Sequence, residues 1–218
     1  MRDKKEFIFR ELTSGKLDFI GDFDGLYKNE LDPWSQSGNT GEIARYYDWS
    51  RKRLLDNIYP DKNSKILEIG SGLGFVTKLI SDRYTLATCY GLDISNVAVT
   101  KSKKLFPHLN FIVDDICSTT FDSRKKYDII ILSQLLWYIL KNLPIAIENC
   151  NKMMKVGSSL IITQAFLKQP QRYGKDIIDG FHGLKNYLIK NSPDDLSISH
   201  LDYDDKNDFI HHDGIISS

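Results

Sequence analysis

The sequence has no net charge, no cysteine pairs at metal-binding spacing and no long apolar run. Its 218 residues include 29 basic (Lys and Arg) and 29 acidic side chains, so no overall field would attract nucleic acid or an anionic membrane. The three cysteines stand far apart, which argues against a disulfide framework or a cysteine zinc site. No apolar run approaches the roughly 20 residues that cross a bilayer, and the first residues lack the apolar region of a signal peptide. We therefore expect a cytoplasmic protein without a membrane span that does not act on nucleic acid.

The order of strand-like and helix-like segments predicts an α/β fold. From about residue 65 onward, apolar runs alternate with amphipathic segments, as in the βαβ units of a parallel sheet. Before that point only "GEIARYYDWSRKRLLDNI" has a helical pattern. We therefore expect residues 61–218 to form the core and residues 1–60 to form a helical lid or flank, within a single domain overall.

The individual elements follow from the apolar periods and the turn residues. Strands are expected at 65–70, 86–95, 110–115, 127–134 and 158–166, and helices at 75–84, 96–106 (capped by Ser95), 142–154 and 174–190. The last helix would carry an apolar stripe of Ile177, Phe181, Leu184 and Leu188. Two alternating runs around "KN", residues 196–205 and 208–217, predict a terminal antiparallel hairpin.

The glycine-rich stretch "GSGLG" at 70–74 follows the first of these strands and opens a helix. Glycines at this place let a ligand approach the main chain, and the helix start offers free N–H groups. A phosphate loop would need Gly-Lys-Ser/Thr, whereas Phe75 and Val76 follow Gly74. The spacing G-x-G-x-G also departs from the dinucleotide fingerprint G-x-G-x-x-G. The glycines alone therefore leave the ligand open.

Acidic residues near the ends of three strands narrow the choice of ligand. Glu68 precedes the first glycine and can face a cationic or amine-bearing group. Asp93 ends the second strand, where an acid can accept hydrogen bonds from both ribose hydroxyls. Asp115 and Ile116 close the third strand, where an acid beside an apolar residue suits an adenine ring. The pattern favours a nucleoside-containing cofactor at the carboxyl edge of the sheet.

The motifs "LEIGSGLG", "GLDIS", "VDDI" and "YDIIILSQLLWYI" resemble those of class I S-adenosylmethionine (SAM)-dependent methyltransferases over about residues 60–218. The resemblance implies a Rossmann-like, mostly parallel seven-stranded sheet of order 3-2-1-4-5-7-6 with helices on both faces, and SAM as cofactor. Its implied cofactor-binding residues are Glu68, Gly70, Ser71, Gly72, Asp93, Ile94, Asp115, Ile116 and Ser133. Among them, Gly70 and Gly72 would approach the methionine part, Asp93 the ribose, and Asp115 with Ile116 the adenine.

A narrower resemblance rests on "DPW" at 32–34 and the helix "YYDWSRKRLL". Both are similar to segments of small-molecule methyltransferases that act on the amino-sugar oligosaccharides of nodulation factors. In that group the N-terminal helix closes over the cofactor. The resemblance implies that Trp34, Tyr47 and Arg51 lie near the cofactor, with Tyr47 and Arg51 one turn apart on the inner face of the helix.

Candidate residues for the acceptor lie beyond the carboxyl ends of the strands. Gln134 could orient the acceptor, and Tyr47 could contact it. The tip of the terminal hairpin gathers His211 with several carboxylates, as either a general base or a solvated turn. Trp137 and Tyr138 could form a wall for a sugar ring or belong to the core. No acid and imidazole set has metal-ligand spacing, so we expect no metal.

Together these observations predict a SAM-dependent methyltransferase of a small molecule. We expect O-methylation of a sugar or sugar-linked group, such as a sugar nucleotide or sugar phosphate, in carbohydrate modification (glycan or capsular polysaccharide) or natural-product biosynthesis. A His or Asp facing the methyl group would favour oxygen as the acceptor, because a hydroxyl benefits from losing its proton, whereas a polar cage without a base would favour nitrogen. The alternatives are N-methylation of a small amine, amino sugar or amino acid, and a non-catalytic partner subunit with a methyltransferase fold.

Overall fold

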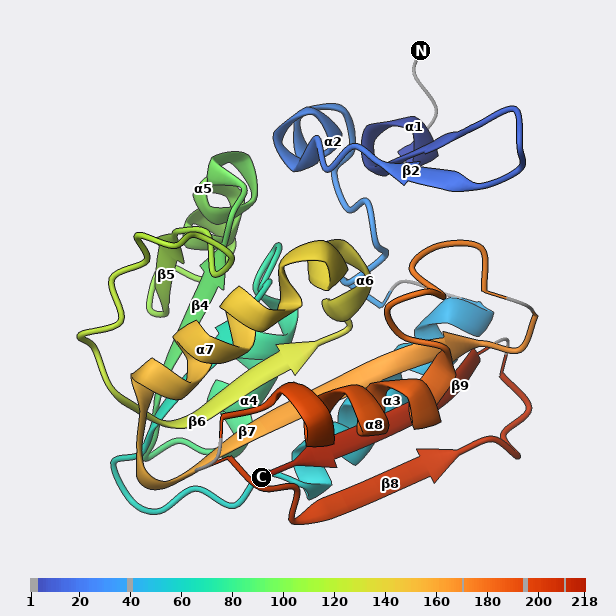
Figure 1. Cartoon of the computed structure of the whole chain (residues 1–218). Helices are drawn as coiled ribbons and strands as arrows, with labels where there is room; N and C mark the ends of the chain where they lie inside the picture. Colours follow the sequence, from blue (N-terminus) through green and yellow to red (C-terminus); the bar gives the residue numbers. More distant parts are fainter. Residues whose placement is uncertain (1–3, 39–40, 170, 194–195, 210) are drawn as a thin grey trace.

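A seven-stranded sheet forms the centre of the structure, which is a computed structural model that describes residues 4–38, 41–169, 171–193, 196–209 and 211–218. The sheet order is β5-β4-β3-β6-β7-β9-β8 (Figure 1). The strands are β3 (Lys65–Ile69), β4 (Thr88–Asp93), β5 (Asn110–Val113), β6 (Tyr127–Ser133), β7 (Met154–Leu167), β8 (His200–Asp204) and β9 (His211–Ser217). Counted within this sheet, the order is 3-2-1-4-5-7-6, which confirms the predicted fold. The first five strands are parallel, and β9 pairs antiparallel with β7 and β8.

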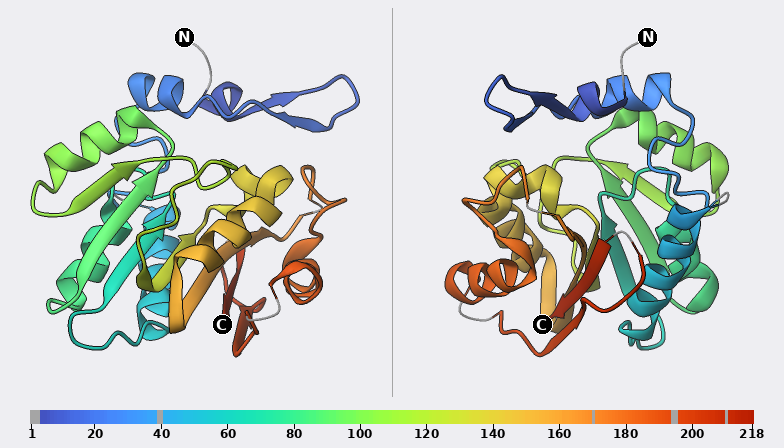
Figure 2. Two further views of the ribbon diagram at one scale, coloured as in Figure 1. Left: turned by 60° about the vertical axis from the view of Figure 1, so that its left-hand side comes forward. Right: turned by 90° about the vertical axis from the view of Figure 1, so that its right-hand side faces the viewer.

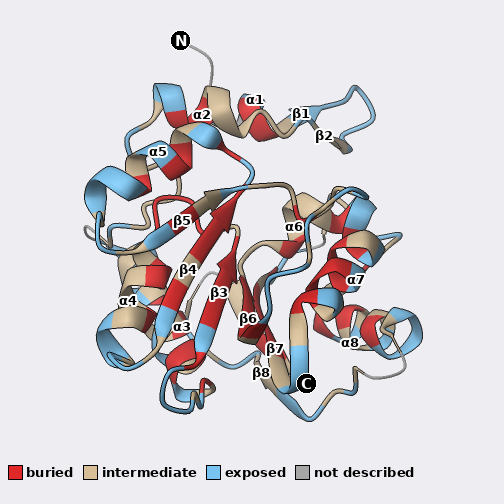
Figure 3. Ribbon diagram, turned by 90° about the vertical axis from the view of Figure 1, so that its left-hand side faces the viewer, coloured by how far each residue is buried: buried red, intermediate tan, exposed pale blue. Residues whose placement is uncertain are grey.

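Helices cover both faces of the sheet. Alternate residues of a strand point to opposite faces, so Ile66 packs towards α3 (Glu42–Asp56) and α4 (Phe75–Arg83), whereas Leu67 packs towards α7 (Leu143–Met153) and α8 (Gly180–Asn191). Figure 1 shows α7 and α8 on the side of the sheet opposite to α3. The central strands are buried along most of their length (Figure 3). The other elements of the core are α5 (Asn96–Leu105), α6 (Leu136–Ile139) and the 3-10 turn η1 (Leu140–Asn142).

Local chemistry fixes the helix ends. The Ser95 side chain accepts a hydrogen bond from the Ala98 amide and caps α5, as predicted. The prediction for α8 was wrong at its start, because the helix begins at Gly180 rather than near residue 174. Gly180 has a φ of 65°, which a helix interior does not accommodate. Ile177 precedes the helix and still packs against the core.

The N-terminal part contains more structure than the sequence predicts. Besides α3, it forms α1 (Lys4–Ile8), β1 (Phe9–Glu11), β2 (Leu17–Phe19) and α2 (Phe23–Asn29). The expectation of a single helical segment was therefore wrong. These elements are too short to give a periodic signal, and their apolar side chains gather in a cluster of their own. They form a layer over the carboxyl ends of the parallel strands (Figure 2). In the described part of the chain, no helix is long and apolar enough to cross a membrane.

Candidate active site

A cavity of about 280 Å³ lies where β3, β4 and β6 end, which is where ligands bind in open α/β sheets. We call it the strand-end cavity. Its lining includes nine of the eleven predicted cofactor-binding residues: Trp34, Arg51, Glu68, Gly70, Asp93, Ile94, Asp115, Ile116 and Ser133. Ser71 and Gly72, which were also predicted, do not line it. The structure thus brings together most of the residues that the motifs single out.

The glycine loop is packed against protein side chains as well as facing the cavity. Gly72 has a φ of 54°, and a Cβ there would lie 2.6 Å from the Tyr27 hydroxyl. Gly74 has a φ of 83°, and a Cβ there would lie 2.5 Å from the Phe111 ring. Both positions therefore require glycine because the backbone is left-handed and no space is free. Close packing inside the protein explains these two glycines without any ligand.

Asp93 ties the glycine loop to the end of β4. Its carboxylate accepts hydrogen bonds from the backbone amides of Gly72 and Ser95, each at 2.8 Å. Burial raises the pKa of Asp93 above its ordinary value, and the two amides only partly oppose this shift. Its predicted bond to a ribose stays a prediction.

Glu68 is buried near the carboxyl end of β3 and lines the strand-end cavity. The Thr77 hydroxyl donates a hydrogen bond to it. Burial raises the pKa of Glu68 from 4.5 to about 8, because the low-dielectric surroundings disfavour the charged form. The side chain is therefore neutral near pH 7 unless a cation lies beside it.

Tyr47 and Arg51 of α3 both line the strand-end cavity. The Arg51 guanidinium carbon lies 5.0 Å from the centre of the Tyr47 ring. The Tyr47 hydroxyl donates to the carbonyl oxygen of Trp34, and Arg51 Nη2 donates to that of Gln36, both at 2.7 Å. The Arg51 Nε is buried and has no hydrogen-bond partner among the described residues. A buried donor without a partner at a cavity wall suits an anionic ligand group.

A second cavity of about 1100 Å³ lies between the β1–β2 hairpin, α3 and the segment after β7. We call it the aromatic cavity, because its lining includes Phe9, Tyr46, Tyr47, Trp137, Tyr138, Tyr173 and His211. The three predicted catalytic residues, Gln134, Tyr47 and His211, all line it. Ile20, Tyr47, Gln134 and Tyr138 line both cavities. These four residues therefore form the boundary between the cavities.

Gln134 is held by the protein rather than free. It has a φ of 57°, which is uncommon for a residue other than glycine. Its Oε1 accepts a hydrogen bond from the Ala165 amide at 2.6 Å. Its Nε2 lies 3.4 Å from both the Ser50 hydroxyl and Asp213 Oδ2. The amide group is thus fixed at the cavity boundary.

His211 is half-buried in the wall of the aromatic cavity, and its ring centre lies 5.7 Å from that of Tyr46. Burial lowers the pKa of His211 below its ordinary 6.5, so the ring is neutral at pH 7. The neighbouring acids have structural roles instead. Asp202 pairs with Arg53 at 2.7 Å, and Asp204 accepts from the amides of the hairpin turn. Of the candidates in this hairpin, His211 is the one that lines the aromatic cavity.

Comparison with known proteins agrees with this geometry. The family described as "Methyltransferase domain" matches residues 67–162. Methyltransferase 235L of Invertebrate iridescent virus 6 is 31% identical over 119 residues, which are 55% of this chain and 44% of that protein. Phosphoethanolamine N-methyltransferase of Plasmodium falciparum is 30% identical over 116 residues, 51% of this chain and 43% of that protein. The chain thus matches less than half the length of these two curated relatives.

Among solved structures, the N-methyltransferase NodS of Bradyrhizobium japonicum in complex with S-adenosylhomocysteine superimposes with a TM-score of 0.65 at 16% identity, covering 89% of this chain and 96% of that one. Residues 67–162 match a methyltransferase domain, and the chain has the class I methyltransferase fold. SAM is the cofactor of this domain class, and the suspected family is thereby confirmed. The sugar acceptor and the roles of individual residues stay predictions.

The strand-end cavity of the methyltransferase domain fits this cofactor chemically. SAM carries a carboxylate, an ammonium group, two ribose hydroxyls and an adenine. Arg51 offers an unpaired buried N–H, and Glu68 and Asp93 offer carboxyl groups in the lining of the same cavity. No cluster of three His, Cys, Asp or Glu side chains that could hold a metal occurs among the described residues.

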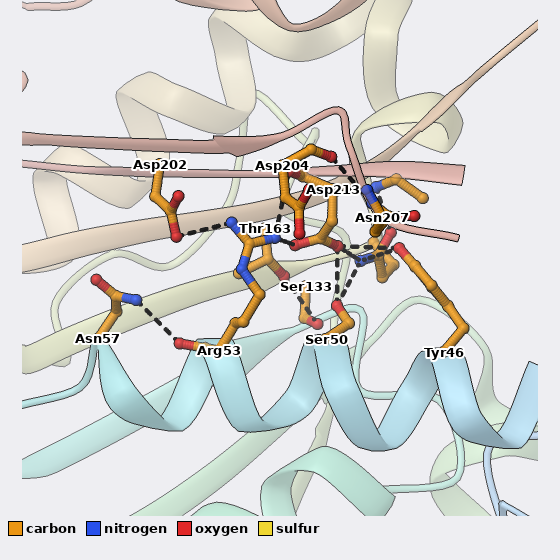
Figure 4. A network of polar contacts seen from close by, with 12 residues as sticks. Tyr46, Ser50, Arg53, Asn57, Ser133, Thr163, Asp202, Asp204, Asn207 and Asp213 are labelled. Carbon is orange, nitrogen blue, oxygen red and sulfur yellow. Dashed lines mark hydrogen bonds and ion pairs between the residues drawn. The ribbon is translucent and has the colours of Figure 1, made fainter. Parts of the chain in front are cut away.

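Sequence reasoning missed a polar network beside the site of the methyltransferase domain. Tyr46, Ser50 and Arg53 of α3 all contact Asp213 of β9, which is fully buried (Figure 4). Their spacing of four and three residues places them on one stripe of the helix. A polar stripe on a flanking helix is normally solvent-exposed. The sequence signal for the network was the acid Asp213 just before the apolar residues Ile215 and Ile216 of β9.

Proposed function

We propose that the chain transfers the methyl group of SAM to a small molecule bound in the aromatic cavity. The observation that carries this proposal is the shared wall of Ile20, Tyr47, Gln134 and Tyr138. A cofactor in one cavity and an acceptor in the other would meet at this wall. Methyl transfer requires little more than such an alignment, because holding two reactants at attack distance supplies much of the rate.

The cofactor is proposed to lie with its methionine end towards α3. Arg51 would bind the carboxylate and Glu68 the ammonium group. Asp93 would accept hydrogen bonds from the ribose, and Asp115 with Ile116 would contact the adenine. Trp34 also lines the strand-end cavity. Bound SAM supplies a methyl group that is bonded to a sulfonium sulfur. The neutral thioether that remains after the transfer is a good leaving group.

A hydroxyl acceptor suits the aromatic cavity better than an amine. As the acceptor oxygen bonds to the methyl carbon and the carbon–sulfur bond breaks, its proton would pass to the neutral His211 ring. Tyr47, which also lines this cavity, suits this role less well, because burial raises its pKa and so disfavours the phenolate that would take up a proton. The wall of aromatic rings also matches the apolar face of a sugar ring. We therefore propose O-methylation of a sugar or sugar-linked group.

N-methylation of a small amine is the second candidate. It is supported by the sequence match to a relative named phosphoethanolamine N-methyltransferase. A neutral amine needs no base to attack a methyl group. Activity on amines that does not depend on His211 would favour this candidate.

The proposed function can be tested with purified protein and SAM carrying a labelled methyl group. Free sugars, sugar phosphates, sugar nucleotides and small amines serve as acceptors, and product structures are determined by mass spectrometry and NMR. Label on a sugar oxygen is the expected result. No label transfer, together with no binding of S-adenosylhomocysteine by calorimetry, would contradict the enzyme hypothesis and favour a non-catalytic partner subunit.

Residues 1–60 are proposed to form the lid of this site. Trp34 and Gln36 line the strand-end cavity, and Phe9 and Ile20 line the aromatic cavity. Arg172, from the segment after β7, pairs with Glu11 of the hairpin at 2.6 Å. The N-terminal part would thus close both cavities at once.

Replacing Arg51 with methionine is expected to weaken binding of S-adenosylhomocysteine by about 10- to 100-fold, the value of a charge-assisted hydrogen bond. Methionine retains most of the apolar stem of the side chain and removes the guanidinium that lies over the Tyr47 ring. Calorimetry measures the affinity. Methylthioadenosine, which lacks the amino-acid part, is expected to bind wild type and variant equally. Lys52→Met, an exposed change on the same helix, is the matched control, and equal losses for both nucleoside ligands would place the methionine end elsewhere.

A further inference from the structure

We propose that Asp213 is a positioning residue whose carboxylate holds two groups in place: the Gln134 amide at the boundary between the strand-end and aromatic cavities, and the Tyr46 hydroxyl beside the aromatic cavity. This inference rests on the proposed methyl transfer. Asp213 lines neither cavity, so it would act only through the residues that do.

The two carboxylate oxygens of Asp213 contact different partners. Its Oδ1 pairs with Arg53 Nη1 at 2.5 Å. Its Oδ2 accepts hydrogen bonds from the hydroxyls of Tyr46 and Ser50, each at 2.9 Å, and Gln134 Nε2 lies 3.4 Å away. Oδ1 thus pairs Asp213 with Arg53, whereas Oδ2 binds Tyr46 and Ser50 of the same helix (Figure 4) and faces Gln134.

Strand geometry places Asp213 and His211 on the same face of β9. Residues two apart on a strand point the same way, and Ile215 continues this row into the cluster under α3. His212 points to the other face, where its ring bonds to the Tyr203 hydroxyl at 2.8 Å. Asp213 therefore fixes the Tyr46 hydroxyl while His211 packs on the Tyr46 ring. Both ends of the Tyr46 side chain are held from one strand.

Asp213 is also opposite Ala165 in the pairing of β7 with β9. The Ala165 amide is the donor to Gln134 Oε1. Gln134 is consequently held at both ends of its amide group, by Ala165 and by the Asp213 network. Its left-handed backbone, which is unfavourable for a side-chain residue, persists because these contacts fix it.

Burial of the Asp213 carboxylate is unfavourable for the stability of the fold. Burial raises its pKa, although Arg53 opposes the shift. Apolar side chains of similar size would often hold a helix to a sheet as well as a buried ion pair does. A polar network is needed here because the groups it fixes are themselves polar: the Tyr46 phenol of the aromatic cavity and the Gln134 amide at the cavity boundary.

The test compares Asp213→Asn with Asp202→Asn. Both aspartates pair with Arg53, but Asp202 touches neither Tyr46 nor Gln134, so it is a matched control. In the complex with S-adenosylhomocysteine, NMR follows the Ala165 amide proton and the Gln134 side-chain amide. We expect both signals to shift in Asp213→Asn and to stay in place in Asp202→Asn. With an acceptor identified, kcat should fall at least about tenfold in Asp213→Asn while KM for SAM stays within about threefold.

Tyr46→Phe keeps the Asp213–Arg53 pair intact and serves if Asp213→Asn does not fold. It is expected to shift the same Gln134 and Ala165 signals and to lower kcat. Equal NMR shifts and equal kcat in the Asp213 and Asp202 variants would overturn the inference. If wild-type protein methylates no acceptor, the proposed function fails alone, because the NMR comparison still decides whether Asp213 holds Gln134.

Discussion

Replacing His211 with glutamine is expected to lower kcat for methyl transfer to a hydroxyl by at least about 100-fold, the lower end of the range for a general base. Glutamine is similar in size but cannot take up a proton. The affinity for S-adenosylhomocysteine should not change, because His211 lines only the aromatic cavity. Burial lowers the pKa of His211 below 6.5, so the wild-type rate should fall only as the pH drops below that value. The acidic limb should disappear in the variant.

His212→Gln is the matched control for this experiment. His212 is the adjacent residue, but its ring bonds to Tyr203 on the other face of the hairpin. We expect its kcat to stay within about twofold of wild type. If His211→Gln retains the wild-type rate on a hydroxyl acceptor, the base lies elsewhere. If it retains the rate only on amines, nitrogen is the natural acceptor atom.

Glu68→Gln is expected to stabilise the protein without cofactor at pH 8 relative to wild type. In the unfolded chain Glu68 ionises near pH 4.5, whereas in the folded protein its pKa is about 8. Wild type therefore loses stability as the pH rises from 4.5 through 8, by up to about 5 kcal/mol from this one group. Glutamine does not ionise, so the variant loses no stability in this way, and its side-chain oxygen can still accept the hydrogen bond from Thr77. Urea unfolding at pH 5 and pH 8 measures the difference.

The exposed change Glu148→Gln is the control and should alter the free energy of unfolding by less than about 0.5 kcal/mol at either pH. Saturating S-adenosylhomocysteine should reduce the pH dependence of wild type, since its ammonium group would favour the ionised Glu68. The same pH dependence for wild type and Glu68→Gln would show that Glu68 is already ionised in the folded protein.

The sheet was predictable because its strands are continuous apolar runs that end at glycines and acids. Burial on both faces makes such runs conspicuous, and Glu68, Asp93 and Asp115 follow from their position at strand ends. The hairpin of β8 and β9 was also found, since its residues alternate around a polar turn. These features are local in the sequence.

The rest of the site depends on contacts between distant residues. Asp213 and Tyr46 are 167 residues apart, and nothing local distinguishes a buried tyrosine from an exposed one. The short elements α1, β1, β2 and α2 form because they pack together over the sheet, and their own sequences carry little signal. The sequence predicted the position of Gln134 but not the contacts that hold its side chain. Its place at the boundary follows from the strand end, whereas its fixed amide depends on Ala165 and Asp213.

The segment that contains Trp34 and Gln36 would control when the cofactor enters and leaves the strand-end cavity. Two hydrogen bonds from Tyr47 and Arg51 fasten its carbonyl oxygens beside the strand-end cavity. We expect both bonds to open before the nucleoside enters or leaves. Product release would then be slower than the chemical step, as in many enzymes with a closing lid. Spent cofactor retained in this way would make the proposed enzyme sensitive to inhibition by its own product.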